Sequence, residues 1–495
     1  MTPRPPHHVA SGAVVIGGGL AGTTAALALA EAGLPVTLVE SRSRLGGLAC
    51  SFRRETAGGA LTVDNGQHVH LRCCTAYQWF LDRIGGRRLA PIRGRLDIPV
   101  LHAGTRRLGR LRRTALPAPL HLAPALGRYP HLTPAERLAA ARAVLALRRL
   151  DPADPALDDV DFAAWLRRHG QSPRAVAALW DLVGVATLNA HAPHASLALA
   201  ATVFRTGLLG AADAADLGWA RVPLGRLHHT LARAALERAG VRVLLSTRAR
   251  ALAREPGGGW LARVEHRGTR AHRAADDAPA ADGAPTPGVE TLRAAAVVLA
   301  VPPGEAHRLL PPGALPDPGR LLKLGAAPIL NIHVVYDRRV LYRPVLAVLD
   351  SPVQWIFDRT EAAGLAEATD GRGGQYLALS QSAAHDDIDR PVAELRRRYL
   401  PALAALLPAA RDARVTDFFV TRERAATFAP APGTRRLRPA AATREPGLCL
   451  AGAWTATGWP ATMEGAVRSG LTAAREVLRT VGRARGDLDP PQEPV

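Results

Sequence analysis

The hydrophobic positions change their period several times along this chain of 495 residues. Ala13–Ile16 is a continuous apolar run that ends in glycines, a pattern typical of a buried parallel strand. Leu20–Ala32 follows with helical character and is closed by Gly33, and Pro35–Glu40 is a second apolar run of strand length. Together these segments predict one βαβ unit of about 30 residues near the start of the chain.

Residues 77–235 show a different pattern. They are rich in leucine, alanine and arginine at helical spacing, and strand signals are few. Thr133–Leu150 begins with a threonine cap, a proline at the first helical position and a glutamate in the first turn, and Asp161 begins another helix that runs to Arg168. This pattern predicts a mostly helical block.

Strand-like runs return after residue 240. Val241–Leu245 and Ala294–Val301 flank a tract at 255–290 rich in Gly, Ala, Asp and Pro, which is expected to form a loose loop or a hairpin insertion. Later apolar runs predict a further sheet with strands at Ile329–Tyr336, Val345–Leu349 and Gln375–Leu379. The chain is then expected to end with a strand at Leu448–Ala451 and a helix at Met463–Thr480.

Composition narrows the class of protein. The length suits two or three domains, and 47% hydrophobic residues are ordinary for a globular chain. The four cysteines show no CxxC pair, so neither a disulfide framework nor a metal site is expected, and a reducing cytoplasm fits. No signal peptide or membrane-spanning run is expected. Four histidines lack metal-ligand spacing and are expected at the surface or as caps: His191, His194, His228 and His229.

The net charge of +20 raises the question of an anionic partner. Lys323 is the single lysine, and an arginine excess of this kind is typical of GC-rich coding. The chain shows no RNP or zinc-finger motif, so nucleic acid is not an expected partner. Arg87–Arg113 interleaves arginines with apolar residues, which indicates either a solvated face or peripheral contact with anionic lipid headgroups on the inner face of the cytoplasmic membrane.

Glycines mark a nucleotide site in the first βαβ unit. Gly17, Gly19 and Gly22 form a GxGxxG pattern between the predicted strand and helix. The first glycine permits the tight turn, the second lets the backbone approach a pyrophosphate, and the third lets the helix pack on the strand. Glu40 ends the second strand, where a carboxylate can bind ribose hydroxyls. The helix N-terminus adds free N–H groups for the phosphates.

The residues after Glu40 narrow the cofactor. Arg44, Gly46 and Gly47 complete an E-x3-R-x-G-G pattern that resembles the FAD-binding signature of the amine oxidase and phytoene desaturase superfamily. Near the other end of the chain, Gly452 and the tripeptide Glu464-Gly465-Ala466 resemble that superfamily's closing motif. In that motif a helix N-terminus points at the flavin. The resemblance implies FAD as the cofactor.

The same resemblance implies the architecture. The predicted fold is α/β, with a Rossmann-type FAD-binding domain and a substrate domain of helices and a mixed sheet, as in amine oxidases. We expect the FAD-binding domain in three parts, the substrate domain as a mainly helical part and a sheet part, and a disordered tail. The FAD-binding parts are 12–75, 225–310 and 440–480. The helical part of the substrate domain is 76–224, its sheet part is 311–439, and the tail is 481–495.

Four further segments resemble the hydroxysqualene dehydroxylases, also called squalene-associated FAD-dependent desaturases. They are VDNGQHV at 63–69, PILNIHVVYDRRV at 328–340, QWIFDR at 354–359 and WTATGWPATM at 454–463. That family acts in bacterial squalene and hopanoid synthesis and replaces the hydroxyl of hydroxysqualene with hydrogen. The resemblance therefore implies a polyisoprenoid substrate, reduced FAD and an electron donor that the sequence does not identify. A carotenoid or phytoene desaturase shares the flavin motifs and is the alternative.

The resemblance also suggests catalytic residues. Loss of an allylic hydroxyl needs a proton donor, and His68 lies in the segment expected to cross the flavin, with Asp64 and Glu464 as nearby acids. Gln67 and His68 are expected to contact FAD. Each residue also has a possible role outside catalysis. Asp64 can hold a turn, His68 can serve solely to bind FAD, and Glu464 can bind flavin or cap its helix.

Three tryptophans are the candidate substrate residues. Removal of the hydroxyl leaves an allyl cation, and an indole face can stabilise positive charge. The candidates are Trp355, Trp454 and Trp459, and packing in the core is the alternative role for each.

Overall fold

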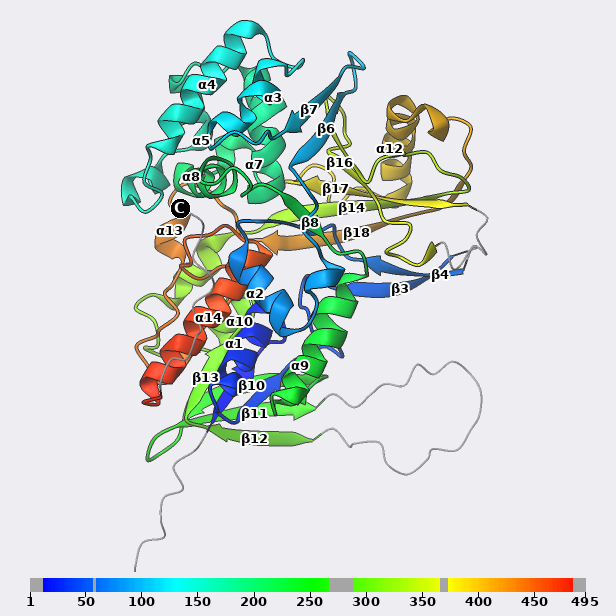
Figure 1. Cartoon of the computed structure of the whole chain (residues 1–495). Helices are drawn as coiled ribbons and strands as arrows, with labels where there is room; N and C mark the ends of the chain where they lie inside the picture. The colour runs from blue at the N-terminus through cyan, green and yellow to red at the C-terminus, as the bar shows by residue number, and fades with distance from the viewer. Residues whose placement is uncertain (1–11, 57–58, 267–287, 366–372, 484–495) are drawn as a thin grey trace, which may run out of the picture.

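A five-stranded parallel sheet lies in the lower half of the molecule in Figure 1. The computed structural model describes residues 12–56, 59–266, 288–365 and 373–483. The strand order is β19-β13-β1-β2-β9, and every pairing is parallel. The strands are β1 (Ala13–Ile16), β2 (Val36–Val39), β9 (Arg242–Leu244), β13 (Ala296–Leu299) and β19 (Leu448–Leu450).

Both faces of this sheet are covered. The side chains of Ala13 and Val15 pack with the helical layer, whereas Val14 and Ile16 pack on the other side with Trp260 and its neighbours. The helical layer consists of α1 (Leu20–Glu31), α2 (Thr75–Arg83), α9 (Ala232–Arg238) and α14 (Met463–Thr480). The opposite layer is an antiparallel sheet of β10 (Thr247–Arg254), β11 (Trp260–His266) and β12 (Val289–Ala294). Burial on both faces explains why the parallel strands are continuously apolar.

Segments from distant parts of the sequence form this one sheet. The predicted parts 12–75, 225–310 and 440–480 each contribute a strand or strands to it. Helix α1 packs directly against α14 (Figure 1), and a Cβ atom on Gly470 would overlap the carbonyl oxygen of Ala21. The close approach of the two helices therefore requires glycine at position 470. The limits of these parts as domains stay a proposal.

A seven-stranded mixed sheet forms much of the upper half of Figure 1. Its order is β18-β14-β17-β16-β15-β6-β7, and only β15 and β6 pair in parallel within the described residues. Helix α12 (Val392–Leu406) covers one face. The strands are β6 (Asp97–His102), β7 (Leu108–Arg112), β14 (Ala327–Tyr336), β15 (Val345–Leu349), β16 (Trp355–Asp358), β17 (Gln375–Ser382) and β18 (Val415–Thr427).

Short helices pack beside this sheet around Phe162, Trp180 and Phe204. Thr133 caps α4 as the sequence predicts, Glu136 completes a reciprocal pair of hydrogen bonds with it, and Asp161 caps α5. The helices are α3 (Ala123–Gly127), α4 (Pro134–Arg148), α5 (Phe162–Arg168), α6 (Pro173–Ala175), α7 (Asp181–Leu188) and α8 (Leu197–Phe204). Two more, α10 (Pro303–Leu309) and α13 (Thr434–Leu437), lie elsewhere in the chain.

The block at 76–224 is less uniformly helical than its sequence predicts. The second half of its arginine-rich stretch forms the hairpin β6–β7, which joins the seven-stranded sheet through β15. In β7 the exposed Arg110 and Arg112 alternate with the buried Gly109 and the half-buried Leu111, so the alternation of one strand lies behind part of the apparent charge run, while β6 is buried over Ile98–Leu101. A smaller ribbon pairs β8 (Leu217–Trp219) of this block with β5 (Val69–Leu71), which precedes the block.

Two other predicted segments have mixed outcomes. The tract at 255–290 begins as the β10–β11 hairpin, and residues 267–287 lie outside the described residues, as does the predicted tail beyond residue 483. A second hairpin, β3 (Ser51–Thr56) with β4 (Gly59–Asp64), leads into the segment at 65–68. Among the helices that the structure describes, none is both long and apolar enough to cross a bilayer.

Candidate functional site

The glycine-rich turn between β1 and α1 has the geometry that a pyrophosphate site needs. Gly17 has a φ of +111°, and a Cβ atom there would overlap the carbonyl oxygen of Ala300. A Cβ atom on Gly22 would overlap the carbonyl oxygen of Gly17. Gly19 differs, because its Cβ would meet only Gly47 Cα, at 3.8 Å. Two glycines thus form the turn, and the third borders open space.

The segment Arg44–Gly47 faces this turn. Gly46 N donates a hydrogen bond to Gly18 O at 2.8 Å, and Arg44 Nη1 donates to Gly47 O at 3.1 Å. Gly46 and Gly47 both have positive φ, and a Cβ on Gly47 would lie 3.0 Å from Gly19 Cα. The two glycine-rich segments therefore bound one space that side chains would fill, at the N-terminus of α1, where backbone N–H groups favour phosphate.

Glu40 connects β2 to the same turn. Its Oε2 accepts a hydrogen bond from Gly18 N at 2.6 Å, and its Oε1 accepts from Arg42 N at 2.8 Å and from Ser41 Oγ at 3.2 Å. The carboxylate lies at the end of β2, the place expected for ribose recognition, and it also fixes the conformation of the glycine turn.

Glu464 caps α2, whereas its place in the sequence suggests that it binds flavin or caps its own helix, α14. Its carboxylate accepts hydrogen bonds from Ala76 N at 3.0 Å and Tyr77 N at 2.7 Å, and it pairs with Arg468 Nε at 2.6 Å. Burial raises the pKa of Glu464, and Arg468 opposes that shift. These three donors anchor the N-terminus of α2 to the first turn of α14, so we assign Glu464 a structural role.

The turn from β19 into α14 is tightly built. Gly452 has a φ of +141°, and its N donates a hydrogen bond to Ser469 Oγ at 2.8 Å. Gly465 N donates to Thr462 Oγ1 at 3.1 Å, which caps α14. Ala466 is half-buried in the first turn of that helix. The first turn of α14 is thereby held beside the parallel sheet.

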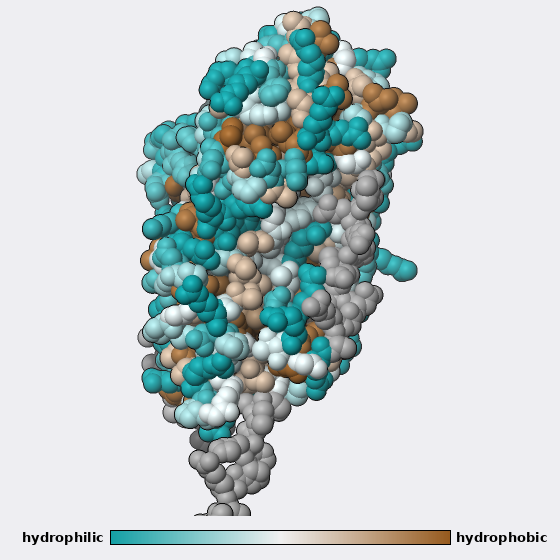
Figure 2. Space-filling model, turned by 90° about the vertical axis from the view of Figure 1, so that its left-hand side faces the viewer, coloured by the Kyte–Doolittle hydropathy of each residue, from teal (hydrophilic) through white to brown (hydrophobic). Residues whose placement is uncertain are grey.

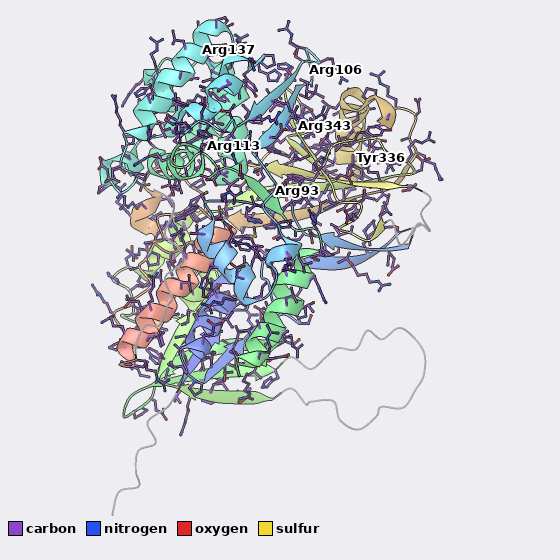
Figure 3. The ribbon with its side chains drawn as sticks, in the orientation of Figure 1. Arg93, Arg106, Arg113, Arg137, Tyr336 and Arg343 are labelled. Atoms are coloured by element: carbon purple, nitrogen blue, oxygen red, sulfur yellow. The ribbon has the colours of Figure 1, made fainter. Side chains whose placement is uncertain are left out.

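A cavity lies between the β5–β8 ribbon and β16, near the middle of Figure 1, where the two halves of the molecule meet. It gathers two charged side chains, one histidine and several apolar groups. The lining residues are Asp64, Gln67, His68, Val69, Trp219, Ala220, Leu224, Phe357 and Arg359. Arg93, labelled beside β8 in Figure 3, covers the Trp219 ring with its guanidinium carbon 4.1 Å from the ring centre.

Asp64 and Arg359 form a buried ion pair in the cavity wall. Arg359 Nη2 donates to Asp64 Oδ2 at 2.9 Å, and the two side chains are 8% and 5% exposed. Asp64 Oδ1 also accepts from Ser51 Oγ at 2.6 Å and from Leu224 N at 2.8 Å. Arg359 Nη1 donates to Ala220 O at 2.7 Å. Asp64 therefore holds the site together, which favours its structural role over proton donation.

His68 presents one ring nitrogen for chemistry. Its Nδ1 lies 3.1 Å from Gly66 O, and because a carbonyl only accepts, Nδ1 is the protonated nitrogen and Nε2 remains available. Burial lowers the pKa of His68, whereas Gly66 O, Asp64 and Glu423 raise it. The neighbouring Gln67 Nε2 is buried without a hydrogen-bond partner among the described residues. An orphaned donor beside the cavity fits a bound cofactor.

Glu423 on β18 is a site residue that the sequence does not reveal. Asn65 Nδ2 donates to Glu423 Oε1 at 3.1 Å, while Asn65 O accepts from Asn331 Nδ2 and Thr421 Oγ1. The segment that carries His68 is thus attached to the seven-stranded sheet. Glu423 lies 355 positions after His68, so no local spacing connects the two residues.

His228 is buried rather than exposed as expected. Its Nδ1 lies 2.9 Å from Ala49 O and must donate, so Nε2 accepts from Tyr77 Oη at 2.9 Å. Burial lowers the pKa of His228 to about 4. His229 also has a structural contact, because its Nδ1 accepts a hydrogen bond from Leu45 N at 3.1 Å. Both histidines support the segment at 44–50.

The three candidate tryptophans lie outside the lining of this cavity, whose aromatic members are Trp219 and Phe357. Trp355 stacks on Phe357, two residues along β16, with ring centres 6.3 Å apart. Trp454 is 7% exposed, and its Nε1 donates to Val301 O at 3.0 Å. Trp459 lies under the guanidinium of Arg468. Trp355 alone adjoins the cavity wall.

The parallel sheet and the two glycine-rich segments at 17–22 and 44–47, together called the glycine cradle here, define a dinucleotide-binding protein. The model of the family described as "Flavin containing amine oxidoreductase" matches residues 20–478. The chain belongs to this family, and FAD is its cofactor. The predicted amine oxidase-like α/β fold is confirmed.

Known relatives refine this assignment. Hydroxysqualene dehydroxylase from Rhodopseudomonas palustris is 30% identical over 476 residues, which cover 95% of this chain and 99% of the relative. Two more proteins of that name match over 93% of the chain. The 15-cis-phytoene desaturase of Synechococcus elongatus is 25% identical over 38% of this chain and 41% of its own length. The predicted resemblance to the hydroxysqualene dehydroxylases is confirmed.

Solved structures show the same fold. Cyclohexylamine oxidase from Brevibacterium oxydans matches with a TM-score of 0.66 and 20% identity, covering 96% of this chain and 100% of that one. The fold, the family and the glycine cradle together establish an FAD-dependent oxidoreductase. Within the described part of the chain, no cluster of three His, Cys, Asp or Glu side chains is arranged to hold a metal ion.

Gly19→Val should abolish FAD binding while the fold is retained. Gly19 has a φ of −73°, which any residue adopts, and its Cβ points into the space between the two glycine segments. The purified variant is expected to lose its flavin absorbance, while its far-ultraviolet circular dichroism spectrum stays the same as that of wild type. Gly304→Ala, in a helix where no atom lies within 4 Å of the new Cβ, is the control. A Gly19→Val protein as yellow as wild type would contradict the assignment.

Glu464→Gln should reduce stability and leave the flavin content unchanged. The amide cannot neutralise Arg468, and one buried N–H of α2 loses its carboxylate partner, so we expect a loss of about 2–3 kcal/mol in the free energy of unfolding. Denaturant titration measures this loss. Glu476→Gln in the same helix, where the carboxylate pairs with the exposed Arg479, should cost under about 0.5 kcal/mol. If the variant lost its flavin but kept its stability, the structural role would be wrong and Glu464 would belong to the cofactor site.

Proposed function

We propose that this enzyme converts hydroxysqualene to squalene by reductive dehydroxylation. The observation that carries the proposal is the cavity at His68, which the two segments that most resemble the hydroxysqualene dehydroxylases, 63–69 and 354–359, line together with residues 219–224. The relatives of that name, which match over nearly the whole chain, support it. The place of the reaction in squalene and hopanoid synthesis is part of the same proposal.

The reaction breaks one C–O bond and forms one C–H bond. The hydroxyl oxygen takes a proton and leaves as water, and the allylic carbon accepts a hydride. FAD in its reduced form supplies that hydride when bound. The protein residues must therefore deliver a proton to the leaving oxygen, shelter the carbon while it is cationic and exclude water from it.

We assign the proton to His68 Nε2. The Nδ1–H bond to Gly66 O fixes the ring, so a proton added to the imidazole resides on Nε2, which remains available at the cavity. Asp64 is already neutralised by Arg359, whereas Glu423 has no ion-pair partner among the described residues and raises the pKa of His68. Glu423 is therefore a positioning residue that favours the protonated imidazole.

The apolar walls suit the carbon that bears the hydroxyl, because the cavity holds only about 10 Å³ of accessible space. Leu224, Val69 and Phe357 offer hydrocarbon contacts, and the π faces of Phe357 and Trp219 can stabilise developing positive charge. The positive charge of Arg359 is compensated by Asp64, so it does not destabilise a neighbouring cation to the full extent. Trp219 and Phe357 therefore take the role that the sequence suggests for Trp454 and Trp459.

A polyisoprenoid desaturase is the second candidate. The similarity to a phytoene desaturase favours it over part of the chain. That reaction runs in the opposite redox direction and needs no proton donor for a leaving oxygen, so the two candidates differ in the role of His68. We also propose a cytoplasmic location, which agrees with free thiols at Cys50, Cys73, Cys74 and Cys449.

Anaerobic turnover should separate the two candidates. Chemically reduced enzyme incubated with hydroxysqualene should yield squalene, and reduction in deuterated form should label the former carbinol carbon or its allylic partner, as read by mass spectrometry. His68→Gln should lower kcat by about a hundredfold or more with little change in KM. Desaturation of phytoene by oxidised enzyme, with no squalene formed from hydroxysqualene, would overturn the proposal.

Glu423→Gln should move the pH profile of kcat. If protonated His68 is the acid, kcat falls as the pH rises through the pKa of His68. Asp64 and Glu423 raise that pKa and Arg359 lowers it, so removal of the Glu423 charge shifts the fall to lower pH and reduces kcat about tenfold near neutrality. Glutamine still accepts from Asn65, so the segment stays attached.

Glu361→Gln, an exposed carboxylate beyond β16, is the matched control and should leave the profile unchanged. A uniform loss of kcat in Glu423→Gln with an unmoved profile would show that Glu423 acts only through the fold.

A further inference from the structure

Helix α4 presents an exposed stripe on which leucine and arginine alternate. The stripe, called here the α4 surface, consists of Leu138, Arg142, Leu145 and Arg149. Successive members are three or four residues apart, so they lie on one side of the helix. Leu138 is 59% exposed and Leu145 is 51% exposed, and both arginines are exposed. The opposite side of α4 packs into the protein through Ala140, Ala143 and Leu147.

In the sequence around the α4 surface, almost all charged residues are positive. Residues 101–150 contain ten arginines and a single acidic residue, Glu136. Glu136 pairs with Arg174 at 2.6 Å and belongs to the cap of α4. Among the residues that the structure describes, no carboxylate pairs with Arg142 or Arg149. The α4 surface thus combines solvent-exposed leucine with uncompensated positive charge.

The segment before α4 adds to the same region. Arg137, labelled in Figure 3, donates to Gly127 O and Tyr129 O and so ties the start of α4 to the end of α3. The approach to α3 carries Leu116 and Leu120, which are 45% and 55% exposed. Figure 2, which views the side on which α4 lies in Figure 1, shows hydrophobic patches between hydrophilic side chains in its upper part.

We propose that the α4 surface docks onto a lipid bilayer that contains anionic headgroups. Exposed leucines lose contact with water when they enter the boundary of the acyl chains, and guanidinium groups bind lipid phosphates. Charge complementarity argues for this occupant, because a helix with positive charge between its leucines matches an anionic interface. The proposal goes beyond the dehydroxylation reaction and does not depend on it.

The structure favours α4 over the stretch Arg87–Arg113 for this contact. Arg110 pairs with Asp97 at 2.5 Å, and Arg113 pairs with the buried Asp216 at 2.6 Å. Several charges that look free in the sequence of that stretch are therefore engaged within the protein. The hairpin β6–β7 also exposes fewer large apolar side chains, with Leu108 at 46%.

Vesicle sedimentation tests the proposal with a matched pair of variants. Leu145→Ser/Arg149→Glu changes one leucine and one charge of the α4 surface. Val392→Ser/Arg397→Glu makes the corresponding change on α12, where Val392 is 41% exposed. The full-length holoenzyme is mixed at low salt with vesicles of phosphatidylglycerol and phosphatidylcholine, and separately with phosphatidylcholine alone.

We expect wild type and the α12 variant to partition equally onto the anionic vesicles and more weakly onto neutral ones. The α4 variant should bind the anionic vesicles at least about tenfold more weakly. Unfolding midpoints and flavin content, measured in parallel, show that each variant is folded.

Two results would overturn the proposal. One is equal partitioning of wild type and the α4 variant, including no binding by either. The other is a change of oligomeric state on sedimentation velocity without a change in vesicle binding, which would make the α4 surface a contact between copies of the chain. Neither result bears on the conversion of hydroxysqualene, which is assayed with detergent-dispersed substrate.

Discussion

The buried ion pair of Asp64 and Arg359 is the interaction on which the candidate site depends. Asp64 ends β4, Arg359 follows β16, and both bind the segment at 220–224, so three distant parts of the chain meet at two side chains. The same three parts carry His68, Trp219 and Phe357. Removing either partner would leave a buried charge uncompensated, at a cost of about 3–5 kcal/mol. The ion pair therefore both shapes the cavity and attaches the β3–β4 hairpin to the end of β16.

The two histidines beside the cavity show how hydrogen bonding separates chemical roles. His228 uses both ring nitrogens, one toward a carbonyl and one toward the Tyr77 hydroxyl, and burial holds its pKa near 4. His68 uses one nitrogen in the same way and keeps the other available. A saturated imidazole supports structure, whereas a half-saturated one can exchange a proton. This difference selects His68 from a histidine-rich neighbourhood.

Local patterns in the sequence predict the elements well where one short segment contains the whole signal. The strand at 13–16, the glycine turn and the helix from residue 463 agree with the structure because spacing alone specifies them. Partners far along the chain are not predictable in this way. The carboxylate of Glu464 caps a helix that begins 389 residues earlier, and Glu423 reaches Asn65 across 358 positions. The β6–β7 hairpin was obscured because its outward arginines dominate a short alternation.

The order of strands in the parallel sheet has a consequence for synthesis of the chain. β1 lies between β2 and β13, so the first strand made waits for its second partner near residue 296, and β13 in turn waits for β19 near residue 448. At about 5–20 residues per second, roughly 15–60 s separate β1 from β13 on the ribosome. During that interval an apolar strand has one natural edge unpaired. The nucleotide-binding half of the protein is therefore complete only when translation is nearly finished, and cofactor capture becomes one of the last events in its biogenesis.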